Sequence, residues 1–183
     1  MIYLKKERKI NRICYNAAMQ KIWSLSLIIL IMALIAPNIS FGAGLEVGPD
    51  EIYLINVPLG KKVAVSKLGG NQMKLNIKNK GAAACTFEIN ILPSTQTTAP
   101  LSPGFTDIPD TSWITPASKE IKISANSSKV VDLYIKIPKN KEFLNKNYQT
   151  VIEVKSKKNR PEELFVLACQ LKMLFSTDTG GKK

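Results

Sequence analysis

The feature that most constrains the fold is a period of two in the apolar residues that follow Leu45. Apolar and polar side chains alternate strictly from Met73 to Lys78, and the pattern recurs from Cys85 to Ile91. Such alternation puts one face of a β-strand in a core and the other in water. Further strands are predicted at residues 51–57, 61–66, 120–124, 130–137, 148–154 and 164–175, separated by Gly, Pro and Asn turns.

Helical periodicity is weak in the same region, where no stretch has the apolar spacing of an amphipathic helix longer than about two turns. Residues 94–118, rich in Thr, Ser and Pro, are expected to be a long connection. The predicted fold class is all-β, an antiparallel immunoglobulin-like sandwich of seven or eight strands over residues 43–176. A signal or anchor helix is expected to precede it, and residues 177–183 are expected to be a disordered tail.

The first 42 residues have the composition of an export segment. Basic residues precede an uncharged apolar run from Ile22 to Ala36, and Ser40 and Gly42 are small residues at the −3 and −1 positions of a cleavage site. This pattern predicts a signal peptide over residues 1–42, with a mature N-terminus at Ala43 and a possible true start at Met19. The alternative is an uncleaved membrane anchor formed by residues 22–36. The expected location is periplasmic or extracellular.

Charge and composition exclude several classes of function. The net charge is +12, but residues 1–42 hold six basic residues and one acid, which leaves +7 scattered over the remainder. We therefore expect no nucleic-acid binding. The sequence has no histidine, the commonest general base and metal ligand. No phosphate-binding loop or calcium loop is present, so no enzyme activity, cofactor or metal is expected.

Two cysteines remain outside the leader, Cys85 and Cys169, and both fall on the inward register of their predicted strands. In an exported protein this favours a disulfide between them. The alternative is two separate buried thiols, because a free cysteine packs as a small apolar side chain.

Three longer stretches carry a resemblance at the level of a family. They read EIYLINVPLGKKVAV (51–65), MKLNIKNKGAAACTFEINI (73–91) and SWITPASKEIKISANSSKVVDLYIKIP (112–138). Over residues 45–175 the chain resembles pilus-chaperone-like bacterial immunoglobulin-like domains and the modules of WxL-interacting surface proteins. The resemblance implies a fold rather than a function. Chaperones have two such domains where this chain has length for one, and their client-anchoring basic residues have no matching motif here.

The sequence leaves three hypotheses for function. The first is an exported non-catalytic binding module of the cell envelope or surface, which recognises a protein or an envelope component. The second is a structural subunit of a fibre, coat or secretion assembly. The third is a carbohydrate-binding module, which rests on Trp113 in the long connection; the alternative for Trp113 is a side chain that closes the end of the sandwich.

The last predicted strand offers a candidate partner edge. Its outward residues Leu164, Val166 and Ala168 are apolar, and the outward face becomes polar only at Gln170 and Lys172. A long edge strand with a half-apolar outer face is a template for pairing with a strand of another chain. The alternative is that a loop or the strand nearest the leader covers it, or that the strand is central in its sheet. A membrane contact is expected only through the leader, if it is not cleaved.

Overall fold

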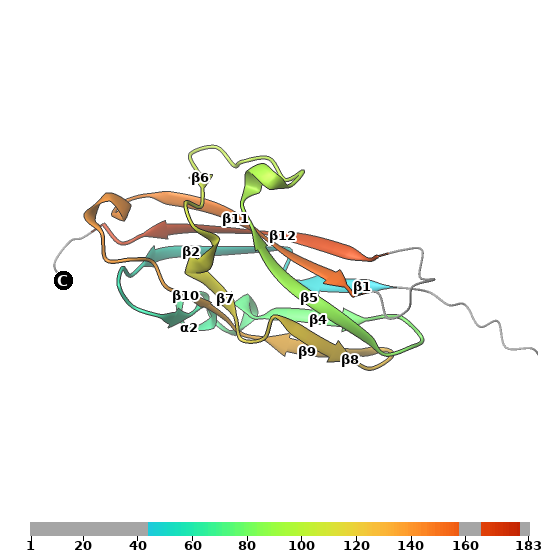
Figure 1. Ribbon diagram of the computed structural model, residues 1–183. Helices are drawn as coiled ribbons and strands as arrows, with labels where there is room; N and C mark the ends of the chain where they lie inside the picture. The colour runs from blue at the N-terminus through green and yellow to red at the C-terminus, as the bar shows by residue number, and fades with distance from the viewer. Residues whose placement is uncertain (1–43, 158–165, 180–183) are drawn as a thin grey trace, which may run out of the picture. The chain divides into compact units, whose positions relative to one another are not determined.

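The computed structural model describes residues 44–157 and 166–179, which form two facing layers of β-sheet (Figure 1). One layer has five strands in a row and a short sixth strand beside β11, and we call it the six-stranded sheet. Its strands in spatial order are β2 (Glu51–Val57), β12 (Ala168–Thr177), β11 (Asn147–Ser156), β5 (Cys85–Leu92) and β8 (Glu120–Ile123), with β6 (Thr106–Asp107) next to β11.

The second layer, which we call the facing layer, is built on two consecutive strands that Asp132 separates. Strand β9 precedes Asp132 and pairs with β4, which in turn pairs with β1. Strand β10 follows Asp132 and lies between β3 and β7. The strands of this layer are β1 (Leu45–Gly48), β3 (Val63–Ala64), β4 (Leu75–Asn79), β7 (Ile114–Pro116), β9 (Ser127–Val131) and β10 (Leu133–Ile135).

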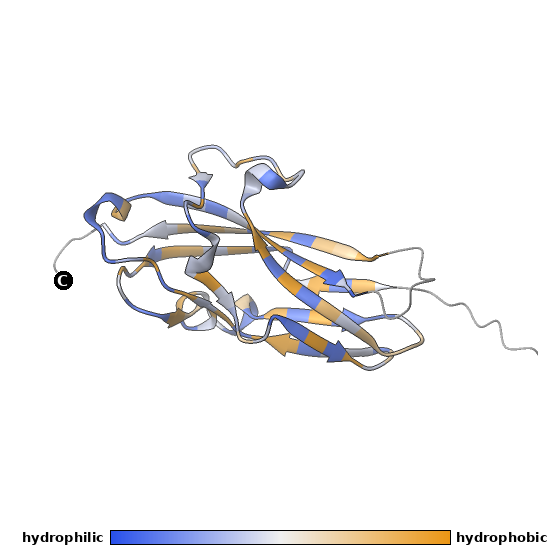
Figure 2. Cartoon of the chain, viewed as in Figure 1, coloured by the Kyte–Doolittle hydropathy of each residue, from blue (hydrophilic) through white to orange (hydrophobic). Residues whose placement is uncertain are grey.

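The core lies between the two layers and is made by the alternating apolar residues. Figure 2 shows hydrophobic and hydrophilic residues following one another along β4 and β5. Leu75, Ile77, Phe87 and Ile89 are at most 3% exposed, as the sequence predicts. Burying a side chain of this size stabilises the fold by about 1.5–3 kcal/mol. The prediction of an all-β sandwich is confirmed for the described residues.

The pairing is not purely antiparallel, which corrects the predicted sheet. Strand β1 pairs antiparallel with β4 up to Gly48, and Pro49, which has no N–H to donate, ends that ladder. The chain then crosses to the other layer, where β2 runs parallel to β12. Strand β6 also runs parallel to β11. The described residues contain twelve strand segments rather than seven or eight, because breaks such as Pro49 and Asp132 divide longer strands.

Short helical turns replace part of the predicted strand at 61–66. Only β3 is extended there, and the chain then forms α2 (Val65–Gly69), whose Val65 is buried. Gly70 ends this helix with φ of 87°, a conformation that glycine adopts without strain. Four 3-10 turns complete the described elements, namely η1 (Asn71–Met73), η2 (Ser94–Gln96), η3 (Thr111–Trp113) and η4 (Lys141–Phe143).

The long connection is fastened to the outer face of the six-stranded sheet by Gln149 of β11. The Gln149 side chain is fully buried; its Nε2 donates to Ser94 Oγ (3.1 Å) and Pro100 O (3.0 Å), and its Oε1 accepts from Ser102 N (2.8 Å). Asp107 also holds the connection in place, because it accepts hydrogen bonds from the backbone N–H groups of Ser94, Thr95 and Ile108. The connection therefore has a fixed path over the sheet, although it has little regular structure.

The ends of the domain are only partly described. Strand β12 includes Thr177, which is 1% exposed, so it extends one residue into the predicted tail. The predicted leader, its apolar run at 22–36 and residues 180–183 lie outside the described residues. Within residues 44–157 and 166–179, no helix is long and apolar enough to cross a membrane.

Candidate functional site

The two halves of β12 have different neighbours. From Lys172 to Thr177 the strand lies between β2 on one side and β11 on the other. From Ala168 to Leu171 it pairs with β11 alone, because the first β2 residue in register is Glu51, opposite Lys172. Figure 1 shows β12 running past the beginning of β2. We call the first four residues of β12 together with the two residues before them (166–171) the open half, and residues 172–177 the flanked half. The strand predicted to lie at an edge is therefore central in its sheet over the flanked half.

Backbone direction identifies which groups of the open half lack a neighbouring strand. Ser156 N donates to Leu167 O (2.7 Å) and Thr177 N donates to Lys146 O (2.9 Å), so the odd-numbered residues of β12 face β11. Because successive peptide groups of a strand point to opposite sides, Ala168 and Gln170 face the other way. On that side, no strand among residues 44–157 and 166–179 pairs with them.

The side chains of the open half present a small apolar surface. Val166 is 45% exposed and Ala168 is also exposed, whereas Leu171 points inward and is buried. The Gln170 side chain donates to Glu153 Oε1 of β11 (3.0 Å). Two residues of the predicted partner edge, Val166 and Ala168, therefore lie together beside the unpaired backbone. The third, Leu164, lies outside the described residues.

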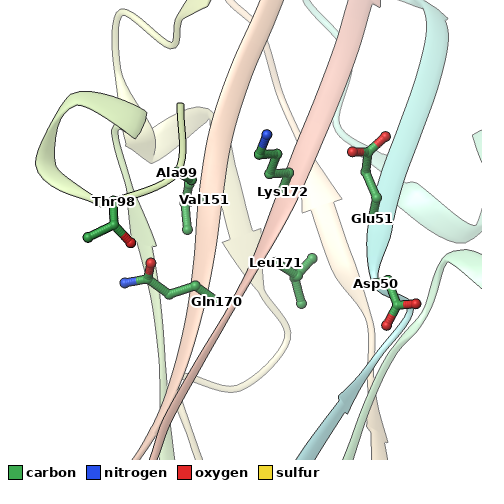
Figure 3. Close-up of a pocket in the computed structure, with 8 residues that line it drawn as sticks. All are labelled: Asp50, Glu51, Thr98, Ala99, Val151, Gln170, Leu171 and Lys172. Carbon is green, nitrogen blue, oxygen red and sulfur yellow. The ribbon is translucent and has the colours of Figure 1, made fainter. Parts of the chain in front are cut away.

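A hollow of about 360 Å³ adjoins the open half (Figure 3). Val151 and Leu171 of the sheet and Thr98 and Ala99 of the long connection are among its lining residues, although the Leu171 side chain itself points to the inner face. The remaining lining residues are polar or charged, namely Asp50, Glu51, Gln170 and Lys172. In the part of the chain that the structure describes, neither the two carboxylates nor Lys172 belongs to an ion pair within 4.0 Å. The hollow thus offers unpaired charges of both signs where β2 begins.

The structure does not support the predicted Cys85–Cys169 disulfide. Cys169 of β12 is opposite Val154 of β11, and Val154 is opposite Ile89 of β5, so two strand spacings, roughly 9.5 Å, separate the strands. Cys85 lies four residues further along β5, which adds about 13 Å in the strand direction. A disulfide needs Cα atoms within about 7 Å. Both cysteines face inward, but inward register alone does not make strands neighbours.

The two thiols have different surroundings. Cys85 Sγ donates a hydrogen bond to Thr86 O (3.5 Å). Burial, and secondarily the charge of Asp50, raises the pKa of the Cys169 thiol. The protonated thiol is a poor nucleophile, so this site is not that of a reactive cysteine.

Trp113 belongs to the core rather than to a binding surface. It is 4% exposed, and its ring lies edge-on to Phe143 (4.8 Å between centroids) and Tyr148 (5.5 Å). The turn before it is capped by Asp110, whose Oδ1 accepts from Ser112 N (2.8 Å). A buried indole cannot stack on a sugar, so the candidate loop aromatic has a packing role.

The acidic residues of the long connection serve structure too. Burial by itself would raise the pKa of Asp107, but hydrogen bonds from the Thr95 hydroxyl and from three backbone N–H groups hold that pKa below its usual value. Four donors around one carboxylate leave little room for a cation. Among residues 44–157 and 166–179, no three potential metal ligands come together.

No family model matches the sequence, and no curated protein matches it. Solved structures do match. The chain is similar to the ASH/PapD-like domain 7 of human CEP192, with a TM-score of 0.50 and 9% identity, over 73% of this chain and 84% of that one. It is also similar to the E. coli chaperone DraB, with a TM-score of 0.48 and 10% identity, over 76% of this chain and 58% of that one. A third match is the Salmonella enterica SafA pilin in complex with the SafB chaperone, with a TM-score of 0.49 and 9% identity, over 76% of this chain and 57% of that one.

The likeness is one of fold. The PapD-like immunoglobulin fold that the sequence resembles is the fold that the structure has. At 9% identity this says nothing about activity, and the chain spans little more than half the length of the two matched chaperone structures. The function therefore has to follow from this chain's own residues.

Proposed function

We propose that this protein is an exported, non-catalytic module that binds another protein by pairing one of its extended segments with the open half of β12. The observation that carries the proposal is the unpaired backbone of Ala168 and Gln170 next to the exposed Val166. Unpaired N–H and C=O groups on a strand edge form a ladder with an incoming strand, which supplies affinity without side-chain chemistry. The sequence of residues 1–42 supports export, and the absence of histidine supports a non-catalytic role.

The apolar surface next to this edge supports side-chain selection as well. An incoming strand would set alternate side chains against Val166 and Ala168, and its backbone would continue the sheet where β2 stops. Two identical chains that met through this edge would form a structural subunit, so the second hypothesis uses the same surface with a different partner. No observation favours a carbohydrate-binding module, because Trp113 is buried.

Site-specific photo-crosslinking tests the proposal in the cells that make the protein. Benzoylphenylalanine is placed at Val166, and as a matched control at Val130, an exposed valine (59%) of β9 in the facing layer. We expect an adduct from position 166 and none from position 130. Mass spectrometry of the adduct then identifies the contacted peptide and distinguishes a second copy of this chain from another protein.

A second experiment repeats the crosslinking at position 166 in a variant with proline at position 168. Proline has no N–H, and its ring projects towards an incoming strand, so Ala168→Pro should abolish the adduct from position 166. Ala168→Val keeps the N–H and should keep the adduct. An adduct that survives Ala168→Pro in a folded protein would show that the open half is not the binding edge.

A further inference from the structure

The outer faces of the two layers differ in charge. On the six-stranded sheet, two lysines form ion pairs: Lys157 Nζ lies 3.0 Å from Glu120 Oε1 and 3.7 Å from Glu88 Oε1, and Lys155 Nζ lies 3.6 Å from Glu88 Oε2. Lys122 and Lys172 form no ion pair with the described residues, but the strands of this sheet also carry Glu51 and Glu153. On the facing layer, lysines outnumber carboxylates. We call five of these lysines the basic face: Lys62, Lys67, Lys74, Lys78 and Lys136.

The basic face has little internal neutralisation. Its one ion pair among the described residues joins Lys74 Nζ to Asp132 Oδ1 at 3.8 Å. Glu46, on the neighbouring β1, pairs with Lys80 (2.5 Å), which lowers the Glu46 pKa, and is also in register with Lys78, whose charge helps to lower that pKa. Lys62, Lys67, Lys78 and Lys136 have no carboxylate within 4.0 Å in the part of the chain that the structure describes. Several uncompensated cations on one side of a small domain produce a positive potential on that side.

Three of these lysines converge on a concave surface. A hollow of about 730 Å³ is lined by Lys62, Lys67 and Lys74 together with Ser66, Asp132 and Tyr134. Lys62 Nζ lies 4.6 Å from the centroid of the Tyr134 ring, which holds the ammonium at the rim of the hollow. Because a concave, low-dielectric surface focuses the field of the charges around it, the hollow favours an anionic group over a neutral one.

The position of the leader indicates what kind of anion this face meets. Both interpretations of residues 22–36, signal peptide and anchor, bring that apolar segment into a membrane, and in the anchor interpretation the segment stays joined to the domain. Eight residues, 37–44, separate its end from β1, and a fully extended chain of that length spans at most about 29 Å. Strand β1 is paired with β4, which carries Lys78. The chain thus enters the domain through the layer that carries the basic face.

We infer that the basic face docks on the anionic phospholipid headgroups of the membrane that receives the leader. Lysines near an anionic bilayer each contribute about 1 kcal/mol of attraction, which falls off within a Debye length. The open half of β12 lies in the other layer, so headgroup binding and strand capture use different surfaces. This inference shares with the proposed function the role of residues 1–42 in export, but it does not depend on strand capture by β12.

The test compares two variants of the full chain that lose the same charge. Lys62→Gln, Lys67→Gln and Lys78→Gln are combined in the first. Lys119→Gln, Lys122→Gln and Lys146→Gln are combined in the control, which removes exposed lysines from β8, from the residue before it and from the turn before β11. Partition onto phosphatidylcholine vesicles with and without an equal share of phosphatidylglycerol is measured by flotation. The leader is identical in both, so any difference between them comes from the domain.

We expect the first variant to bind anionic vesicles about a hundredfold more weakly than the unmodified chain, and the control less than a few-fold more weakly. Neutral vesicles should not distinguish the three proteins. Replacing the same three lysines by arginine should restore binding, which separates charge from an effect on folding. Equal losses in the two variants would overturn the proposal, since net charge alone would then account for binding. It would equally be overturned if soluble polyglutamate bound the basic face while anionic vesicles bound no better than neutral ones.

Discussion

The two halves of β12 share one alternating sequence but have different neighbours. In the flanked half, Met173 and Phe175 point into the core, and the backbone is paired on both sides. In the open half, Cys169 and Leu171 also point inward, but β2 is absent from the far side. Side-chain alternation fixes which residues are buried, whereas the path of a distant segment fixes which backbone groups are paired. A segment paired on both sides and a segment paired on one side can therefore lie next to each other on one strand.

Large-to-small substitutions should give the largest difference in unfolding free energy between the two halves. Phe175 is fully buried and contacts Tyr148 (5.6 Å between ring centroids), so Phe175→Ala should cost about 3–5 kcal/mol of unfolding free energy. Val166 is 45% exposed, and Val166→Ala should cost less than about 0.5 kcal/mol. Urea denaturation measures both. A cost above about 2 kcal/mol for Val166→Ala would mean that the open half is covered and that the division of β12 is wrong.

Proline substitutions should show how the two halves differ in backbone pairing, because proline removes one N–H group. Residues 168 and 172 have the same parity, so both N–H groups point away from β11. Lys172 is in register with Glu51 of β2, and Lys172→Pro should cost roughly 3 kcal/mol because it removes a ladder bond and its ring clashes with β2. Ala168 is in register with no strand of the described residues on that side, although β1 lies near β12, and Ala168→Pro should cost less than about 1 kcal/mol. Thermal unfolding of the two variants checks the difference, and equal destabilisation would contradict it.

A smaller effect is expected at Cys169, the cysteine of the open half. The carboxylate of Asp50 contributes to the raised pKa of this thiol, after burial. Removing the negative charge in Asp50→Asn should lower the Cys169 pKa, increase the thiolate fraction at pH 8 and speed alkylation. Mass spectrometry after timed alkylation resolves Cys169 from Cys85, which serves as the internal control. An unchanged rate at Cys169 would mean that Asp50 does not influence the thiol.

The sequence predicted the strands well because alternation is a local property. It placed β2 at its observed bounds, put Phe87 and Ile89 inward on β5, and gave the exposed positions Val166 and Ala168. It also predicted the immunoglobulin-like sandwich. Each of these depends on residues that are close together in the chain.

What the sequence could not predict depends on strand order. The prediction of a Cys85–Cys169 disulfide was wrong because β11 separates the strands of the two cysteines. The parallel pairing of β2, and with it the open half of β12, follows from the crossover at Pro49. That proline sits between two strand-like runs and was the one local signal of a change of layer. The buried Gln149 could not be found either, because its partners lie about fifty residues away in a connection without periodicity.

Residue-resolved amide hydrogen exchange of the full chain tests the central claim most directly. In the open half, the Ala168 and Gln170 amides point away from β11, and no strand within residues 44–157 and 166–179 pairs with them, whereas those of Cys169 and Leu171 point towards β11. The account predicts fast exchange at residues 168 and 170 and strong protection at residues 169 and 171. The even-numbered amides should become protected from position 172 onward, where β2 begins. Protection of Ala168 and Gln170 equal to that of their neighbours would contradict the account, since another part of the protein would then already occupy the edge that we propose for a partner.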